Sequence, residues 1–185
     1  RSVLITAASS GVGLVALQLA RAAGCPTIAV TTHGNKAAAL APLADHVVVS
    51  PSPAGLPDAV RQVSGFEHVD VSIDPVGPAN VAALTDLAAT DGHVLYYGLL
   101  GYQEIPFDMR SPILKDMAIH GYTVHRLLRE PGAAEAVVHQ VMRLAESGAV
   151  APVVAARHPF TEAQNALREM AENAHIGKLV LEVNS

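Results

Sequence analysis

The sequence predicts an α/β fold built on a doubly wound, mostly parallel sheet of six strands in the order 3-2-1-4-5-6, with helices on both faces. Two observations support this. Short, almost continuously apolar segments alternate with segments of helical periodicity along most of the 185 residues, which is typical of parallel strands buried on both faces. Right-handed crossovers between such strands then give the doubly wound order.

The strands and helices are expected as follows. Strands are predicted at Val3–Thr6, Thr27–Thr31, His46–Val49, Val69–Ile73, His93–Tyr97 and near Ala118–Val124. After the first strand, a helix is predicted to bury Val12, Val15, Ala16, Leu19 and Ala23, which recur at helical spacing. Further helices are expected over residues 35–43, 56–63, 79–89 and 133–147.

The last part of the chain differs from this pattern, and we divide the sequence into residues 1–150 and 151–185. Residues 152–156 are expected to be extended. Thr161 and Gln164 have the spacing of a capping box, which predicts a helix ending near Asn173. Residues 177–183 are predicted to form a final strand.

Composition limits the possible functions. Half of the residues are hydrophobic and only 16% are charged, enough for one good core. The formal net charge is −5 and the basic residues are scattered, which argues against a nucleic-acid partner. The single cysteine, Cys25, excludes a disulfide framework and a thiolate zinc site within this chain. No apolar run is long enough for a membrane span, and a reducing, cytoplasmic setting is expected.

The turn after the first strand has the composition of a phosphate-binding loop. It consists of small residues, which let a phosphate approach the backbone and the N-terminus of the following helix. Two registers fit a glycine fingerprint, one starting at Gly11 and one at Ala8. The alternative is an ordinary tight turn before an amphipathic helix. The predicted pyrophosphate-binding residues are Ala8, Ser9, Ser10, Gly11, Val12 and Gly13.

Ligands of such sheets bind outside the carboxyl ends of the strands, where the strand order reverses. Four stretches meet this condition, and all are small, glycine-containing or polar: residues 8–13, 31–36, 74–77 and 98–101. Their agreement is the strongest functional indication in the sequence. Any ligand site is therefore expected at this edge of the sheet.

The end of the second strand predicts NADP(H) as the preferred cofactor. An NAD-preferring fold places an acidic residue there to bond the ribose 2′-hydroxyl, and this stretch has none. Lys36 supplies positive charge, while three neutral side chains are suited to hydrogen-bonding a phosphate: Thr31, Thr32 and Asn35. The alternative is that Lys36 is only a solvated residue at the start of a helix.

No catalytic residue and no metal site are predicted. His120 and His125 lie five residues apart, which fits neither one helix face nor one strand face. Tyr96 and Tyr97 should point to opposite faces of their strand, with core packing as the expected role. Asp74 is either a base or a structural carboxylate that caps the next helix.

Several motifs together resemble the medium-chain dehydrogenase/reductase superfamily, within it the zinc-independent quinone oxidoreductase branch. They are Ala7–Gly13 with Gln18–Ala20, the Lys36 region, Asp74–Gly77, Gly92–Gly98 and Gly177–Leu181. The short-chain dehydrogenases are excluded because no Tyr-x-x-x-Lys pair is present. The resemblance implies a Rossmann sheet, pyrophosphate at the turn and the 2′-phosphate at Lys36. It also implies further cofactor contacts, with the nicotinamide beside Val76 and Gly98 to Leu100; the set is Pro75, Val76, Gly98, Leu99 and Leu100.

The resemblance implies NADPH-dependent reduction of a quinone or conjugated carbonyl. Members of the superfamily also carry an N-terminal GroES-like catalytic domain, which is not in this sequence. The chain is therefore expected to be an excised cofactor-binding domain with poor turnover, whose residues 151–185 would partly pack on that domain. Two alternatives remain open: a fragment of a zinc-dependent alcohol dehydrogenase, and a non-catalytic dinucleotide-binding or interaction module.

A homodimer is also expected. Residues 117–124 should form the edge strand of the sheet, which presents unpaired backbone groups to a second copy. The resemblance implies the same, because related reductases join their sheets there.

Overall fold

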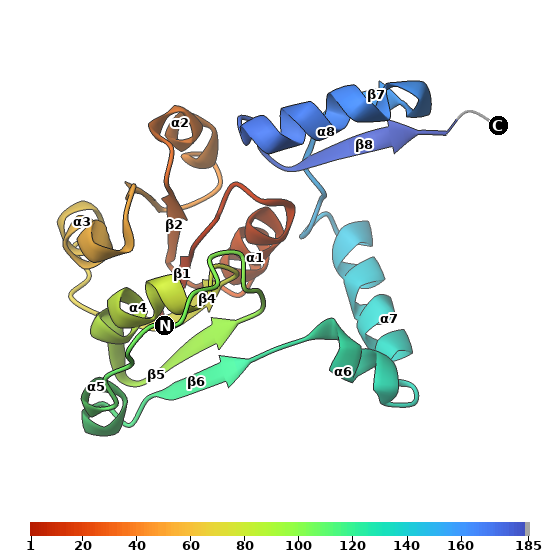
Figure 1. Ribbon diagram of the computed structural model, residues 1–185. Helices are drawn as coiled ribbons and strands as arrows, with labels where there is room; N and C mark the ends of the chain where they lie inside the picture. Colours follow the sequence, from red (N-terminus) through yellow and green to blue (C-terminus); the bar gives the residue numbers. More distant parts are fainter. Residues whose placement is uncertain (184–185) are drawn as a thin grey trace.

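A six-stranded parallel sheet forms the centre of the protein (Figure 1). The structure is a computed structural model that describes residues 1–183. The strand order is β3-β2-β1-β4-β5-β6, which confirms the predicted order. The strands are β1 (Val3–Ile5), β2 (Thr27–Thr31), β3 (His46–Val49), β4 (Val69–Asp74), β5 (Ala88–Tyr96) and β6 (Ala118–Gly121).

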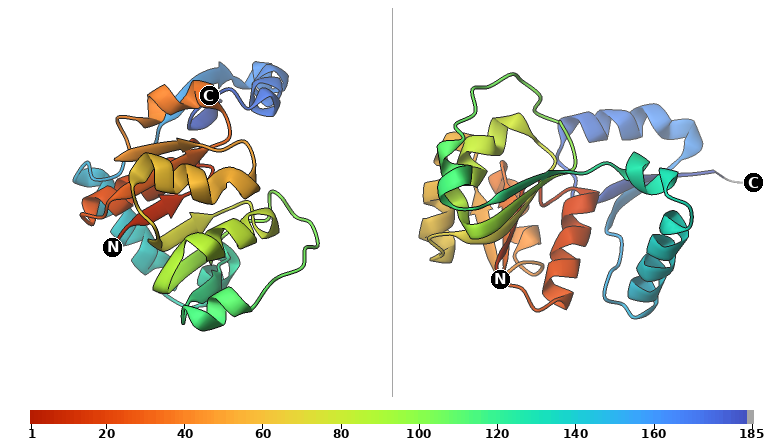
Figure 2. Two further views of the ribbon diagram at one scale, coloured as in Figure 1. Left: turned by 90° about the vertical axis from the view of Figure 1, so that its left-hand side faces the viewer. Right: turned by 90° about the horizontal axis from the view of Figure 1, so that it is seen from below.

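Helices lie on both faces of the sheet (Figure 2). The helices before the C-terminal unit (residues 154–182) are α1 (Gly11–Ala22), α2 (Ala37–Leu40), α3 (Leu56–Ser64), α4 (Val81–Leu87), α5 (Arg110–Leu114), α6 (Val124–Arg129) and α7 (Ala133–Glu146). Two separate apolar cores result. Leu14, Leu17 and Leu40 of α1 and α2 pack on one face, whereas residues of α3 and α4 such as Val60 and Leu84 pack on the other.

The buried face of α1 differs from the predicted one. Leu14, Leu17 and Ala20 are buried, together with Gly13, whereas Val12 and Leu19 are 49% and 40% exposed. The helix is apolar around most of its circumference, so two stripes of apolar residues share the helical spacing. Gly13 packs against the preceding turn, and this contact orients the helix so that the Leu14 stripe faces the sheet. Helical periodicity in the sequence gives no information about such a contact.

Several boundaries also differ from the predictions. β5 begins at Ala88, before the predicted His93, because Ala88 already pairs with Val69 of β4 and the register then shifts before His93 pairs with Val71. β6 ends at Gly121, and the following residues form α6. The capping box is wrong: a short 3-10 turn over Phe160–Glu162 precedes the last helix, whose cap Glu162 makes no side-chain bond.

Residues 154–182 form a second, smaller unit. It consists of β7 (Val154–Pro159), α8 (Ala163–Glu172) and β8 (Lys178–Glu182), with the two strands paired in parallel. Hydrogen bonds connect this C-terminal unit to the part of the chain that forms the six-stranded sheet. The Gly177 amide donates to the Ser9 carbonyl at 2.9 Å, and the Ala151 amide just before the unit donates to Gln18 Oε1 at 2.6 Å.

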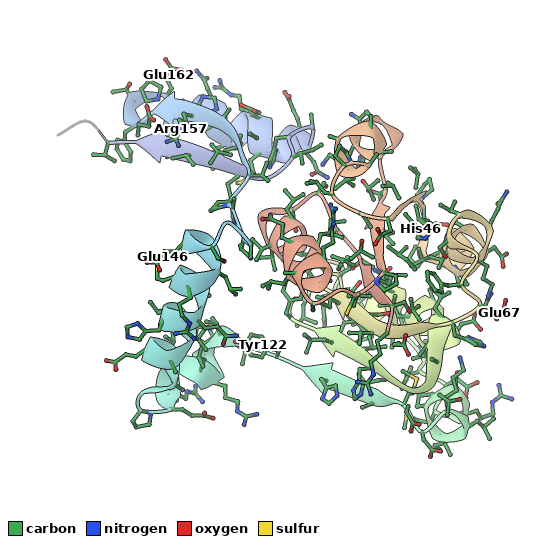
Figure 3. All side chains as sticks on the ribbon, turned by 180° about the vertical axis from the view of Figure 1, so that it is seen from behind. His46, Glu67, Tyr122, Glu146, Arg157 and Glu162 are labelled. Carbon is green, nitrogen blue, oxygen red and sulfur yellow. The ribbon has the colours of Figure 1, made fainter. Side chains whose placement is uncertain are left out.

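β6 is an edge strand of the six-stranded sheet, as predicted. Beyond it the chain leaves the sheet through Tyr122 to α6 and α7, and α7 lies apart from the sheet up to its end at Glu146 (Figure 3). No residue of α7 is buried, and Val138 and Met142 are more than half exposed. Within residues 1–183 no helix combines the length and hydropathy needed to cross a bilayer.

The carboxylate of Asp74 joins the ends of β1 and β4. It is fully buried and accepts three hydrogen bonds, from Thr6 Oγ1 at 2.5 Å, the Gly77 amide at 2.6 Å and Asn80 Nδ2 at 2.7 Å. A buried carboxylate is tolerated when donors satisfy its oxygens in this way. Of the two roles considered for Asp74, the structure therefore supports the structural one.

Replacing Asp74 by Asn is expected to lower the free energy of unfolding by about 2–4 kcal/mol, because an amide NH₂ would then face a buried donor. Denaturant unfolding followed by circular dichroism measures this. The exposed Asp91, at φ +57°, offers a control, since Asn tolerates that backbone conformation. Equal losses for Asp74→Asn and Asp91→Asn would contradict the structural role.

Candidate functional site

A cavity of about 1000 Å³ lies at the carboxyl ends of the strands, where the strand order reverses between β1 and β4. Its wall combines loops that follow β1, β2, β3, β4 and β5 with residues of the C-terminal unit. This is the place that the four predicted stretches indicated. From these stretches, the cavity is lined by Ser9, Ser10, Gly11, Thr31, Thr32, His33, Lys36, Val76 and Leu100.

The turn before α1 is held by close backbone packing. Ser10 caps the helix, and its Oγ accepts a hydrogen bond from the Gly13 amide at 3.0 Å. A Cβ at Gly13 would lie 2.6 Å from the Ala7 carbonyl oxygen, so only glycine fits there. Ser9, Ser10 and Gly11 therefore line the cavity at the N-terminus of a 12-residue helix, where an anion is favoured.

The other three predicted turn residues do not line the cavity. Ala8 and Gly13 are buried behind the turn. Val12 is 49% exposed and lies outside the cavity wall. The ligand contact expected of these three residues stays a prediction.

Lys178 covers this turn. Its side chain lies against Gly11 so closely that a Cβ there would come within 2.9 Å of Lys178 Cδ. Lys178 also lines the cavity. Gly11 thus leaves space for the aliphatic part of the Lys178 side chain, which places this cationic residue beside the N-terminus of α1.

At the end of β2, the structure brings Thr31, Thr32 and Lys36 to the cavity, whereas Asn35 is exposed and outside it. Ser50 and Ser52, which follow β3, line the same part of the cavity. Ser50 is buried, and its hydroxyl donates to the Ser52 carbonyl at 2.8 Å. This corner is therefore rich in hydroxyl groups.

Lys36 is a buried cation. Only 3% of it is exposed, and its Nζ donates to Asn173 Oδ1 at 2.9 Å. None of the ion pairs among residues 1–183 includes Lys36. Burial lowers the pKa of the ammonium from its usual value. A buried ammonium whose one protein partner is a neutral amide is a suitable site for an anion.

The loops after β4 and β5 cross each other tightly. Gly98 packs against Pro75, which leaves neither of them in the cavity wall. Leu99 faces a second, mainly apolar cavity of about 600 Å³ that Gly77 and Tyr96 also line. In the main cavity, Val76, Ala79 and Asn80 represent the loop after β4, and Leu100 represents the loop after β5.

Tyr96 and Tyr97 are half-buried, and neither hydroxyl has a hydrogen-bond partner among residues 1–183. Tyr96 packs against the core on the α3–α4 face, in line with its expected role. Burial raises the pKa of both phenols, and the Asp74 carboxylate adds to the effect. Both are therefore neutral near pH 7.

Several residues of the cavity wall were not predicted. Six lie in or next to the C-terminal unit: Met170, Asn173, His175, Gly177, Lys178 and Leu179. His175 Nδ1 is buried without a hydrogen-bond partner among residues 1–183. The Gly177-Lys178 motif was a signal for this contribution, but nothing in the local sequence connects it to a turn about 170 residues earlier.

Residues 1–183 contain no cluster of side chains suited to a metal ion. No group of three or more His, Cys, Asp or Glu side chains within residues 1–183 could hold an ion. His93 and His120 stack with their ring centroids 5.3 Å apart, and Nδ1 of the first lies 3.1 Å from Nε2 of the second. This pair sits on β5 and β6, away from the cavity wall.

Comparison with known proteins agrees with this geometry. Residues 11–147 match the family model "Zinc-binding dehydrogenase". The acryloyl-coenzyme A reductase of Metallosphaera sedula is 28% identical over 181 residues, covering 97% of this chain and 50% of that protein. This chain therefore spans about half the length of that relative.

Solved structures show the same fold. The quinone oxidoreductase from Thermus thermophilus, determined also in complex with NADPH, matches with a TM-score of 0.83 and 26% identity over 99% of this chain and 58% of that one. An NAD-dependent alcohol dehydrogenase matches with a TM-score of 0.83 and 26% identity, covering 99% and 51% of the two chains.

The family match extends from α1 to the end of α7 and so includes most of the six-stranded sheet. The part of the relatives that this chain matches is their Rossmann-like domain. The chain therefore belongs to the zinc-binding dehydrogenase family of the medium-chain dehydrogenase/reductase superfamily and corresponds to the cofactor-binding domain of these oxidoreductases.

Proposed function

We propose that this chain binds NADP(H) in preference to NAD(H), for hydride transfer to a quinone or conjugated carbonyl. The observation that carries the proposal is the buried Lys36, whose ammonium contacts a neutral amide and lines the cavity at the end of β2. A 2′-phosphate would supply the missing negative charge. An NAD-preferring site has a carboxylate at the end of this strand, and here the strand ends in threonines.

The remaining groups of the cavity would hold the rest of the cofactor. The amides at the N-terminus of α1, with Ser9, Ser10 and Gly11, are suited to the diphosphate. The nicotinamide would lie beside Val76 and Leu100. Its hydride chemistry is supplied by the cofactor, while these residues bind and orient it. No residue of this chain is proposed to exchange a proton with the substrate.

Two names among the similar proteins support the substrate class. Acryloyl-coenzyme A is a conjugated thioester, and the Thermus thermophilus relative is a quinone oxidoreductase crystallised with NADPH. Both substrate types accept a hydride at an electron-poor carbon. We infer a zinc-independent reductase, with residues 151–185 packing partly on an N-terminal catalytic domain.

Replacing Lys36 by Met is expected to weaken NADPH binding by about 10- to 100-fold and to change NADH binding by less than about twofold, because only NADPH carries the 2′-phosphate. Calorimetric titration of the chain with each cofactor measures the ratio. The methionine fills the same buried space, so the fold should be retained. An unchanged NADPH-to-NADH ratio would contradict the proposed preference.

Replacing Lys178 by Met is expected to weaken NADPH and NADH by a similar factor, about tenfold, since both cofactors carry the diphosphate that this lysine would approach. The same titrations therefore separate the two lysines. Lys36→Met changes the ratio of the two affinities, and Lys178→Met changes both affinities together. A change in the ratio for Lys178→Met would place Lys178 at the 2′-phosphate and not at the diphosphate.

We also propose a homodimer that forms through residues 117–124, since β6 ends the sheet and exposes Ile119 by 39%. Light scattering at micromolar concentration should give the mass of two chains. Ile119→Lys is expected to shift it toward one chain, because the charge would be buried in the joined edges. Val63→Lys is the control, because Val63 is 48% exposed on α3 and lies outside the edge strand. A single-chain mass for the unmodified protein would refute the dimer.

A further inference from the structure

The partner of Lys36 comes from the other unit of the protein. Asn173 lies 137 residues later in the sequence and ends α8. In Figure 1 the C-terminal end of α8 approaches α2, the helix that Lys36 precedes. The hydrogen bond between the two side chains, 2.9 Å long, therefore spans the two units at the rim of the cavity.

The backbone of Asn173 is in the left-handed region, with φ +50° and ψ +31°, and its amide donates to the Met170 carbonyl at 3.1 Å. Glycine is the usual residue at such a helix end, and asparagine is the side chain that tolerates it best. Glycine at position 173 would therefore be sufficient for the left-handed backbone at the end of α8. The asparagine adds an amide oxygen, and this oxygen accepts from Lys36 Nζ.

The chemistry of this partner preserves the charge of the lysine. An amide oxygen fixes the direction of the ammonium and occupies one of its three protons, leaving two for another acceptor. A carboxylate at the same place would neutralise the charge and repel a phosphate. Within residues 1–183 no acidic side chain forms an ion pair with Lys36.

We infer that Asn173 is a positioning residue for cofactor discrimination: it holds the buried Lys36 ammonium toward the 2′-phosphate, so that the C-terminal unit takes part in selecting NADPH. This inference rests on the proposed NADP(H) preference. It assigns a second role to α8, whose end lines the cavity beside Lys36.

Three variants test the inference by titration with NADPH and NADH. Asn173→Gly removes the amide oxygen and keeps the left-handed helix end; it is expected to weaken NADPH by about fivefold and NADH by less than about twofold. Asn173→Asp keeps the shape and adds a negative charge, and should weaken NADPH by more than about tenfold. Asn165→Ala, an exposed position on the same helix, is the control and should change neither affinity.

A double variant tests whether Asn173 acts through Lys36. In a Lys36→Met background, Asn173→Gly should have no additional effect on NADPH, because the group that it positions is gone. Equal additional weakening in both backgrounds would overturn the inference, as would an Asn173→Gly variant with unchanged or tighter NADPH binding.

The two proposals fail in different ways. If Lys36→Met leaves the NADPH-to-NADH ratio unchanged, the proposed cofactor preference is wrong. If Lys36→Met lowers the ratio and Asn173→Gly does not, the preference stands and only the role of Asn173 is refuted. Thermal unfolding of each variant, expected within about 2 °C of the unmodified chain, shows that the helix end is intact.

Discussion

The buried carboxylate of Asp74 fixes the relative position of the two strands between which the cavity opens. β1 and β4 are neighbours in the middle of the sheet, and the chain reverses its direction of strand addition between them. Thr6 directly follows β1, and Gly77 and Asn80 lie in the loop after β4. All three residues donate a hydrogen bond to the Asp74 carboxylate. The loops on both sides of the cavity therefore have a common anchor that is shielded from water.

Close packing at two glycines positions the turn after β1. Gly13 allows α1 to start directly against the Ala7 carbonyl, which aims the helix N-terminus at the cavity. Gly11 leaves the space that the Lys178 side chain fills. The first turn and the last strand thus meet at a distance that no larger side chain at Gly11 would permit, and their contact holds Lys178 beside the turn. Lys178 and Lys36 both line the cavity.

The sheet and the general place of the cavity could be predicted because they depend on local patterns. Parallel strands are short apolar runs, and their carboxyl ends follow from chain direction alone. The buried side of α1 could not be predicted, since its apolar residues surround the helix and the choice is made by contact with the turn. The helix after β6 was also missed, because Tyr122, Thr123 and Val124 are residue types common in strands and were included in the predicted strand.

The site was predictable to the extent that its residues follow strands. Thr31, Thr32 and Lys36 were expected from the end of β2, and the structure places them together. Asn173, His175 and Lys178 were not, because they reach the cavity through the second unit, and the contact between the units is a property of the tertiary structure. The burial of Lys36 has the same origin, since Asn173 accepts from it.

The C-terminal unit has only two strands, and such a sheet has little stability in water on its own. Its hydrogen bonds to the rest of the chain, from Gly177 to Ser9 and from Lys36 to Asn173, involve residues of the cavity wall. A ligand that fills the cavity would touch both units at once and so hold them together. Amide hydrogen exchange in residues 154–182 would then slow with cofactor concentration, while the centre of the large sheet would exchange slowly with or without it.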